Sequence, residues 1–299
     1  MKQRVDIAGG TNPRLELSSD RDFDQGAGAR VAQQTEQTGI TKALADLLAG
    51  AGRWRIWMVL AMFDIRARYR RSRLGQFWIT LSMAVTICAL AVVYSAIFKI
   101  HLAEYLPLVA ISFIAWGLIA ALVNDGATVF IESEAYLRSS PLPKSMFIYR
   151  MLARNTMIFG HNLVLVPIVM AVFGITPAWT TLLFVPAFFL TLLNGVWIAM
   201  VLGTLCARFR DMPPIVSSIV QIAFFVSPVM WGRHQLGAEH QFIADWNPFA
   251  MFLELLREPL LGHAPAPHIW LMAMAATVAG FLVALVFFAR FRARIAYYM

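Results

Sequence analysis

Charged residues are scarce in this sequence: Asp, Glu, Lys and Arg make up 14% of its 299 residues, whereas 59% of the residues are hydrophobic. A soluble domain carries about 25% charged residues. The mean hydropathy of +0.65 points in the same direction as this shortage of charge. The composition therefore excludes an ordinary soluble protein and indicates an integral membrane protein.

Cysteine is also rare, and the two present, Cys88 and Cys206, lie in or at the edge of apolar segments. There they behave as small hydrophobic residues, so neither a disulfide framework nor a metal site is expected. The net charge of +8 could suggest nucleic-acid binding. However, Lys and Arg stand beside long apolar runs rather than on a separate polar domain, so we expect no nucleic-acid partner.

Motifs of ATP hydrolysis are missing as well. No G-x-x-x-x-G-K-[ST] loop occurs, and "LLAGAGRWR" has glycines but neither the lysine nor a preceding strand. The acidic residues and His161 are scattered, with no pair spaced as a general acid and base, which argues against a membrane transferase. An internal inverted repeat and a selectivity filter are not evident either, which argues against a secondary transporter and a channel.

Long apolar runs dominate what remains. A membrane core about 30 Å thick requires roughly 20 mostly apolar residues in a helix, and alternating short segments of a β-barrel are not seen. We therefore predict an all-α membrane protein with six spans, preceded by a disordered cytoplasmic tail over residues 1–48, so that residues 49–299 form the transmembrane domain. The spans are Phe77–Phe98, Tyr105–Val123, Met157–Phe173, Trp179–Ala207, Ile215–Met230 and Ile269–Ala289.

Basic residues in short connections are retained on the cytoplasmic side, and every second connection here is basic. Both termini are therefore predicted to be cytoplasmic. The basic residues are Arg53, Arg55, Arg66, Arg68, Arg70, Arg71 and Arg73 before the first span, Arg138, Lys144, Arg150 and Arg154 after the second, Arg208 and Arg210 after the fourth, and Arg290, Arg292 and Arg294 after the sixth.

The segment before the first span has the pattern of an amphipathic helix at the membrane interface. Its apolar residues Trp54, Trp57, Met58, Ala61, Met62, Ile65 and Tyr69 recur at spacings of three and four, and Arg66, Arg70 and Arg73 share another face. A simple topology anchor would show the same composition, so both interpretations stay open.

Two connections differ from ordinary linkers. The cytoplasmic one, from Asn124 to Arg150, combines an acidic helical stretch with "SSPLPKS", whose prolines stiffen the chain. It is either a structural loop or a contact for a soluble partner. The outer one, from Trp231 to His268, contains "DWNPFAMFLELLREPLLGHAPAP", with Asn247 and Pro248 as helix start signals and Gly262 as a stop. We expect a re-entrant helical hairpin there, because the segment is too short and too charged to cross a membrane.

Three stretches taken together carry a resemblance: "FDIRARYRRSRLGQFW", "LCARFRDMPPIVSSIVQIAFFVSPVMW" and "NPFAMFLELLREPLLGHAP". In this order and on these elements they are similar to the membrane subunits of ABC exporters of bacterial polysaccharides, including O-antigen, capsule and teichoic-acid permeases. The resemblance covers residues from Arg53 to the C-terminus. It implies export of a lipid-linked polysaccharide across a bacterial inner membrane by a homodimer with two copies of a separate ATPase subunit, which would bind the ATP and Mg²⁺. An ABC exporter of a drug or a small lipid is the alternative.

The resemblance also implies roles for particular residues. An interface helix, with a possible contact to a lipid pyrophosphate, would include Trp54, Trp57, Arg66, Arg70, Arg71 and Arg73. A coupling helix that docks on the ATPase would include Glu132, Glu134, Tyr136, Leu137, Arg138, Pro141, Pro143 and Lys144. The outer re-entrant region would include Trp246, Asn247, Pro248, Phe249, Phe252 and Arg257.

Polar residues within spans are candidates for a transport pathway, because they are costly in lipid and usually face a bundle interior. His161, Asn162 and Asn194 qualify, with interhelical hydrogen bonding as the alternative for each. At the inner end of the fourth span, Arg208, Arg210 and Asp211 either fix a tight turn or contact a lipid-linked pyrophosphate. The sequence leaves these alternatives open.

Overall fold

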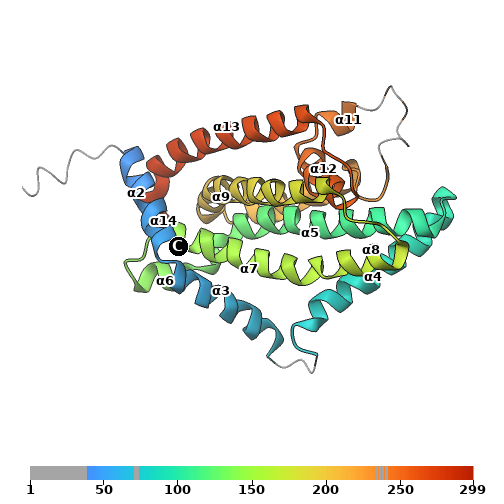
Figure 1. The fold of residues 1–299 in the computed structure, drawn as a ribbon. Helices are drawn as coiled ribbons and strands as arrows, with labels where there is room; N and C mark the ends of the chain where they lie inside the picture. Colours follow the sequence, from blue (N-terminus) through green and yellow to red (C-terminus); the bar gives the residue numbers. More distant parts are fainter. Residues whose placement is uncertain are drawn as a thin grey trace, which may run out of the picture. The chain divides into compact units, whose positions relative to one another are not determined.

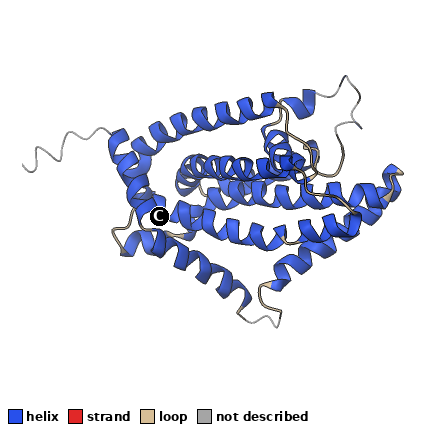
Figure 2. Cartoon of the chain, in the orientation of Figure 1, coloured by secondary structure: helices blue, strands red, loops and turns tan. Residues whose placement is uncertain are grey.

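The structure is a computed structural model that describes residues 39–70, 74–232, 235, 237, 239 and 242–298. Within these ranges the chain forms helices and loops without a strand, which confirms the all-α prediction (Figure 2). The helices in chain order are α2 (Gly39–Gly52), α3 (Trp54–Tyr69), α4 (Phe77–Phe98), α5 (Leu102–Glu132), α6 (Glu134–Ser139), α7 (Ser145–Leu163), α8 (Leu165–Phe173), η1 (Trp179–Leu183), α9 (Phe184–Arg208), α10 (Met212–Val226), α11 (Phe242–Asp245), α12 (Pro248–Leu260), α13 (Pro267–Phe291), η4 (Arg292–Arg294) and α14 (Ile295–Tyr298).

Five helical segments of the described chain are long and apolar enough to cross a membrane, and the fifth predicted span is present as the shorter apolar helix α10. Helix α10 has 15 residues and ends at Val226, because Ser227 takes an extended conformation. At 1.5 Å per residue it spans about 22 Å, less than a membrane core. The five long segments are Phe77–Phe98, Leu102–Ser139, Ser145–Phe173, Trp179–Arg208 and Pro267–Arg294.

Two of these segments extend further than predicted at their charged ends. Helix α5 continues beyond Val123 to Glu132, and the third segment begins at Ser145 rather than Met157. The reason is that the charges in these extensions pair with one another, since Arg154 Nη2 lies 2.9 Å from Asp125 Oδ2. A charge whose partner lies on a neighbouring helix does not end a helix, and hydropathy alone cannot show such a partner.

Helix α5 lies at the centre of the bundle (Figure 1). In the most apolar stretch of α5, 67% of the residues are buried, compared with 17–33% in the corresponding stretches of the other four long segments. It approaches α9 closely at Gly203, where an added Cβ would lie 2.6 Å from Val129 Cγ1 and 3.0 Å from the Gly126 carbonyl oxygen. Small residues of this kind permit close helix contacts in membranes, where apolar burial alone gives no drive to associate.

The bundle has two chemically different ends. We call one the basic end, because arginines of η4 and of the α9–α10 turn lie there. Arg292 of η4 pairs with Asp46 of α2, and Arg210 of the turn pairs with Glu134 of α6. We call the other the distal end. It joins α5 to the segment after α10, through Tyr105 Oη and the Met230 carbonyl, and η1 to the end of α12, through Thr180 Oγ1 and the Gly262 carbonyl.

The predicted tail over residues 1–48 is wrong for its last ten residues, because α2 begins at Gly39. Residues 1–38 lie outside the described residues. The Asp46 carboxylate accepts hydrogen bonds from the Lys144 and Ser145 amides at the start of α7, at 3.4 and 2.9 Å, and pairs with Arg292 at 2.8 Å. Gly50 allows the approach, since a Cβ there would lie 2.2 Å from Ser145 Oγ. Tertiary contacts with distant residues thus stabilise this helix.

Candidate functional site

The predicted coupling region forms a short exposed helix, α6, at the basic end. Tyr136 is 40% exposed, while its ring packs on Phe147 at 6.1 Å and lies under the Arg150 guanidinium at 5.3 Å. Ser140 is extended, and Pro141 and Pro143 fix the chain between α6 and α7. Leu137 and Leu142 are partly buried against the core. A short helix with an exposed face is therefore joined to α7 by a stiff, proline-containing segment, which we call its base.

Ion pairs and hydrogen bonds join α6 and its base to the neighbouring elements. Glu134 lies 2.8 Å from Arg138 and 3.6 Å from Arg210 of the α9–α10 turn. Lys144 Nζ donates to the Arg292 carbonyl at 3.0 Å. Burial and the nearby Arg292 lower the pKa of Lys144, against the opposing effect of Asp46. The turn after α9 and the end of α13 are therefore connected to the same short helix.

A cluster of charged residues, most of them partly buried, connects α3 with α5 and α7. Arg150 contacts both carboxylate oxygens of Asp64, at 2.8 and 2.5 Å. Arg154 bonds to Asp125 at 2.9 Å and to Glu132 at 3.2 Å, and it lies 3.8 Å from Asp64. Bidentate arginine–carboxylate pairs fix geometry as well as supply energy. We call these five residues the charge cluster.

Sequence reasoning missed this cluster as a site, and it missed Asp46. The partners of Asp64 lie 86 residues away or more, so no local spacing identifies them. The only signal was the presence of single acidic residues in segments otherwise rich in arginine or apolar residues.

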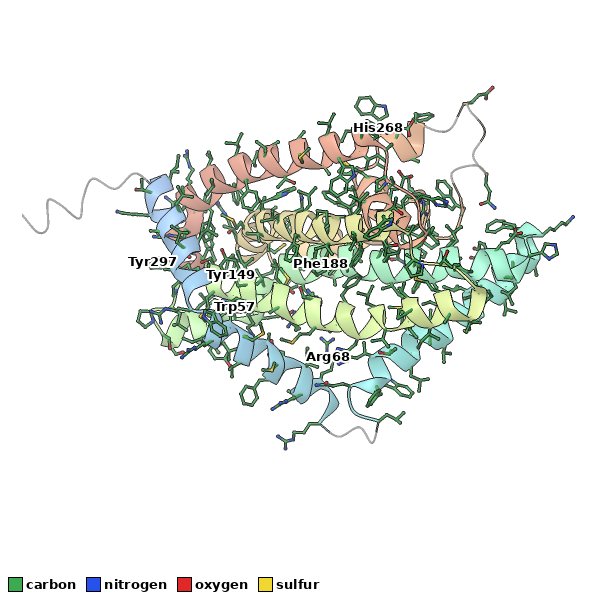
Figure 3. The ribbon with its side chains drawn as sticks, viewed as in Figure 1. Trp57, Arg68, Tyr149, Phe188, His268 and Tyr297 are labelled. Atoms are coloured by element: carbon green, nitrogen blue, oxygen red, sulfur yellow. The ribbon has the colours of Figure 1, made fainter. Side chains whose placement is uncertain are left out.

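The predicted interface helix corresponds to α3, and its apolar residues divide between two faces. Ala61 and Ile65 are buried, and Trp57 lies against Tyr149 with ring centroids 6.1 Å apart (Figure 3). Trp54 and Met62 are exposed instead. The side chains of Arg66, Arg68 and Arg70 are exposed too, whereas Arg71 and Arg73 lie outside the described residues.

Two of the three pathway candidates, His161 and Asn194, make hydrogen bonds within or between helices, whereas the Asn162 Oδ1 has no hydrogen-bond partner among the described residues. His161 Nδ1 lies 2.7 Å from the Met157 carbonyl, and the His161 carbonyl accepts from Thr80 of α4. Asn162 is buried. The buried Asn194 donates to Thr277 of α13 at 2.7 Å and to the Leu190 carbonyl at 2.8 Å, and it accepts from Trp197. The three hydrogen bonds of the Asn194 side chain are thus all made to other residues of the protein.

At the distal end, the segment expected to form a re-entrant hairpin contains the one-turn helix α11 and the 13-residue helix α12. The start signals of α12 are confirmed: the Asn247 side chain accepts from the Phe249 and Ala250 amides, and Pro248 occupies the first turn. Gly262, with φ +88°, follows its end. Trp246 is exposed, and Phe249 and Phe252 are partly buried.

Helix α12 is buried more deeply than its charges suggested. Arg257 is 3% exposed. Its Nη1 donates to the Pro228 carbonyl at 2.8 Å and to Ser112 Oγ at 3.4 Å, and its Nε and Nη2 donate to Glu258 at 3.1 and 3.0 Å. The arginine thus links α12 to α5 and to the turn after α10. A short charged helix is stable when buried in the protein in this way, because protein groups surround its charges.

Comparison with known families gives this architecture a class. Residues 55–261 match the family of ABC-2 type transporter membrane proteins. The chain therefore belongs to the ABC-2 transporter membrane family, as the three sequence stretches predicted. Membership implies a membrane context and a transport role in combination with an ABC ATPase, and helices α2 and α13 lie outside the matched residues.

Individual relatives within this class have more specific names. The chain is similar to an O-antigen export system permease protein RfbA of Myxococcus xanthus, with 22% identity over 219 residues that cover 73% of this chain and 84% of the relative. Two proteins of the same name from Klebsiella pneumoniae are 20% and 19% identical, over 76% and 66% of this chain and 89% and 76% of the relatives.

Proposed function

We propose that this chain is the membrane subunit of an ATP-driven exporter that moves a lipid-linked bacterial polysaccharide, of the O-antigen or capsule type, out of the cytoplasm. The observation that carries the proposal is the match to three permeases named for O-antigen export, each along at least two thirds of its length. The family match, over residues 55–261, supports the transport class independently of those names.

The basic end faces the cytoplasm in this proposal. Basic residues gather near α2, α6, the α9–α10 turn and η4, whereas the described part of the distal end carries Lys99 and Arg257. Retention of Lys and Arg on the cytoplasmic side favours that orientation in an inner membrane.

Helix α6 is the docking element for the ATPase in this proposal. A force on Tyr136 passes to Phe147 of α7 and, through Arg150, to Asp64 of α3. Arg154 extends the same connection to Asp125 of α5. A movement of α6 would therefore displace the interface helix and two spans together. Two chains and two ATPase copies form the assembly, and the ATP and Mg²⁺ belong to the ATPase.

A deletion of the gene tests the cargo. We expect finished, lipid-linked polymer to accumulate on the cytoplasmic side, located by membrane fractionation and immunoblotting of surface glycans and their precursors. Normal surface glycan without a trapped precursor would refute the polysaccharide assignment and favour export of a drug or a small lipid. Complementation with the unaltered gene is the control.

Replacement of Pro141 and Pro143 by alanine tests the docking role. The base of α6 loses its stiffness, so we expect the complex with the ATPase to show reduced stimulated hydrolysis and reduced export, with normal membrane insertion. Unchanged complex formation and hydrolysis would exclude α6 as the coupling element.

A further inference from the structure

An apolar groove of about 610 Å³ is lined by residues of α5, α9, α10, α12 and α13. Its walls include Val201 of α9, Ile219 of α10 and Val283 of α13, and Phe249 and Phe252 of α12 border it. The volume falls in the range of small-molecule sites, about 300–1,000 Å³. Ile219 and Val283 are exposed, so the groove opens on the surface of the described chain.

The groove offers apolar surface and almost no polar group. Asn194 borders it, but its amide is held by Thr277, Leu190 and Trp197, as described above. Thr191 also borders it, and its hydroxyl donates to the Ala187 carbonyl. A hydroxyl-rich sugar would therefore find no free partner along the walls, whereas a hydrocarbon chain fits their chemistry.

Two arginines continue the groove walls toward the basic end. Arg208 follows Val201 by seven positions and Trp197 by eleven on α9, and Arg290 follows Val283 by seven and Ala279 by eleven on α13. Seven and eleven residues are close to whole helical turns, so each arginine lies on the groove-facing stripe of its helix. Each lies about 10 Å along the helix from the last groove residue.

The two arginines also lie at the same level. The hydrogen bond from Asn194 to Thr277 and the contact of Trp197 with Gly280 both join residues 83 positions apart, so α9 and α13 run parallel with this offset. The same offset carries Arg208 to position 291, next to Arg290. Figure 1 shows α9 and α13 extending in parallel toward the basic end.

Both guanidinium groups are available for an anion. They are exposed, and within the described chain neither makes a hydrogen bond or an ion pair. Arg208 is oriented by the rings of Phe209 and Tyr298, at 5.1 and 5.8 Å. The neighbouring Arg210 is already paired with Glu134. Arginine binds phosphate through two parallel hydrogen bonds, which suits a lipid phosphate at a membrane surface.

We propose that this groove is a binding site for a resident anionic phospholipid, whose phosphate contacts Arg208 and Arg290 and whose hydrocarbon chain occupies the groove. From Thr191 to Leu202 the α9 wall covers about 16 Å, and it begins about 10 Å from Arg208, so a hydrocarbon chain whose phosphate lies at Arg208 enters the groove from the basic end. The site is separate from the cargo and does not depend on which molecule is exported.

The test uses the full-length chain in phosphatidylcholine nanodiscs that contain a small fraction of phosphatidylglycerol with a photoreactive acyl chain. Phosphatidylcholine with the same chain is the lipid control. After illumination, labelled peptides are located by mass spectrometry. We expect phosphatidylglycerol to label α9 and α13 in the groove, and each of Arg208→Gln and Arg290→Gln to lower that labelling about fivefold.

Matched variants on α13 test the groove itself. Ala279→Phe fills it and should abolish the labelling, whereas Ala275→Phe, one turn earlier and exposed outside the groove, should not change it. Equal labelling by both lipids, or labelling unaffected by the arginine substitutions, would overturn the proposal. So would displacement of the probe by a polyprenyl pyrophosphate at a lower concentration than phosphatidylglycerol, because the occupant would then be a carrier lipid. Cross-linking of two copies through Ala279→Cys would also overturn it.

Discussion

Replacement of Arg150 by methionine probes the charge cluster that joins α3 to α7. The side chains of Arg150 and Asp64 are 15% and 19% exposed, and their two hydrogen bonds are short. The variant leaves a largely buried carboxylate without this partner. Hydrogen bonds to charged groups contribute about 1.5–3 kcal/mol, and removing one member of a fully buried pair costs about 3–5 kcal/mol. Partial exposure lowers the estimate, so we expect a loss of about 2–3 kcal/mol.

The assay is thermal unfolding of the purified protein in detergent, where this loss should lower the Tm by several degrees. Arg138→Gln is the control, because it removes a pair with Glu134 in which the arginine is 59% exposed. Such surface pairs contribute less than about 1 kcal/mol.

The double variant Asp64→Leu with Arg150→Met tests the interpretation. It removes both charges, so it should recover most of the stability that Arg150→Met loses. Equal Tm changes in Arg150→Met and Arg138→Gln would refute the argument from burial. A double variant less stable than the single one would show that Asp64 contributes mainly through other contacts.

Three further substitutions test separate contacts. Gly203→Ala should lower the free energy of unfolding by about 1–3 kcal/mol, because its Cβ meets α5, whereas Gly160→Ala, with open space around it, should not; equal effects would contradict the close packing. Asp46→Ala should free α2 from the start of α7, measured as faster amide hydrogen exchange in α2; unchanged exchange would show that Asp46 does not hold α2 in place. Asn194→Leu should lower the Tm but leave export at wild-type levels in intact cells, and lost export with a normal Tm would make Asn194 a pathway residue.

Local signals in the sequence were sufficient for some elements. Helix α4 has the predicted limits, Phe77–Phe98, because an uninterrupted apolar run is bounded by polar residues. Helix α12 has its predicted start and stop, because Asn247 and Gly262 act on their own neighbours. In both cases the determining residues lie within a few positions of the boundary.

The remaining features depend on residues far apart in the chain. Helix α2 is fixed by Asp46, whose partners lie 98 to 246 residues away. The long charged ends of α5 and α7 require each other, since Arg154 pairs with Asp125 and Glu132. Predicting the groove would have required knowledge of how α9 aligns with α13. The sequence alone shows only the seven-residue spacing between Val201 and Arg208. Single-sequence patterns give the apolar length of a helix, but not which charges will find partners.

The membrane interior and the basic end of the bundle hold their helices together by different contacts. In the membrane interior, helices associate by close packing of small residues, as at Gly203. At the basic end, short ion pairs join α3, α5 and α7 in a fixed geometry beside α6. A partner that pushes on α6 would therefore move these elements as one body. Stability lost in Arg150→Met should accordingly be accompanied by weaker coupling to the ATPase, whereas stability lost in Gly203→Ala should not.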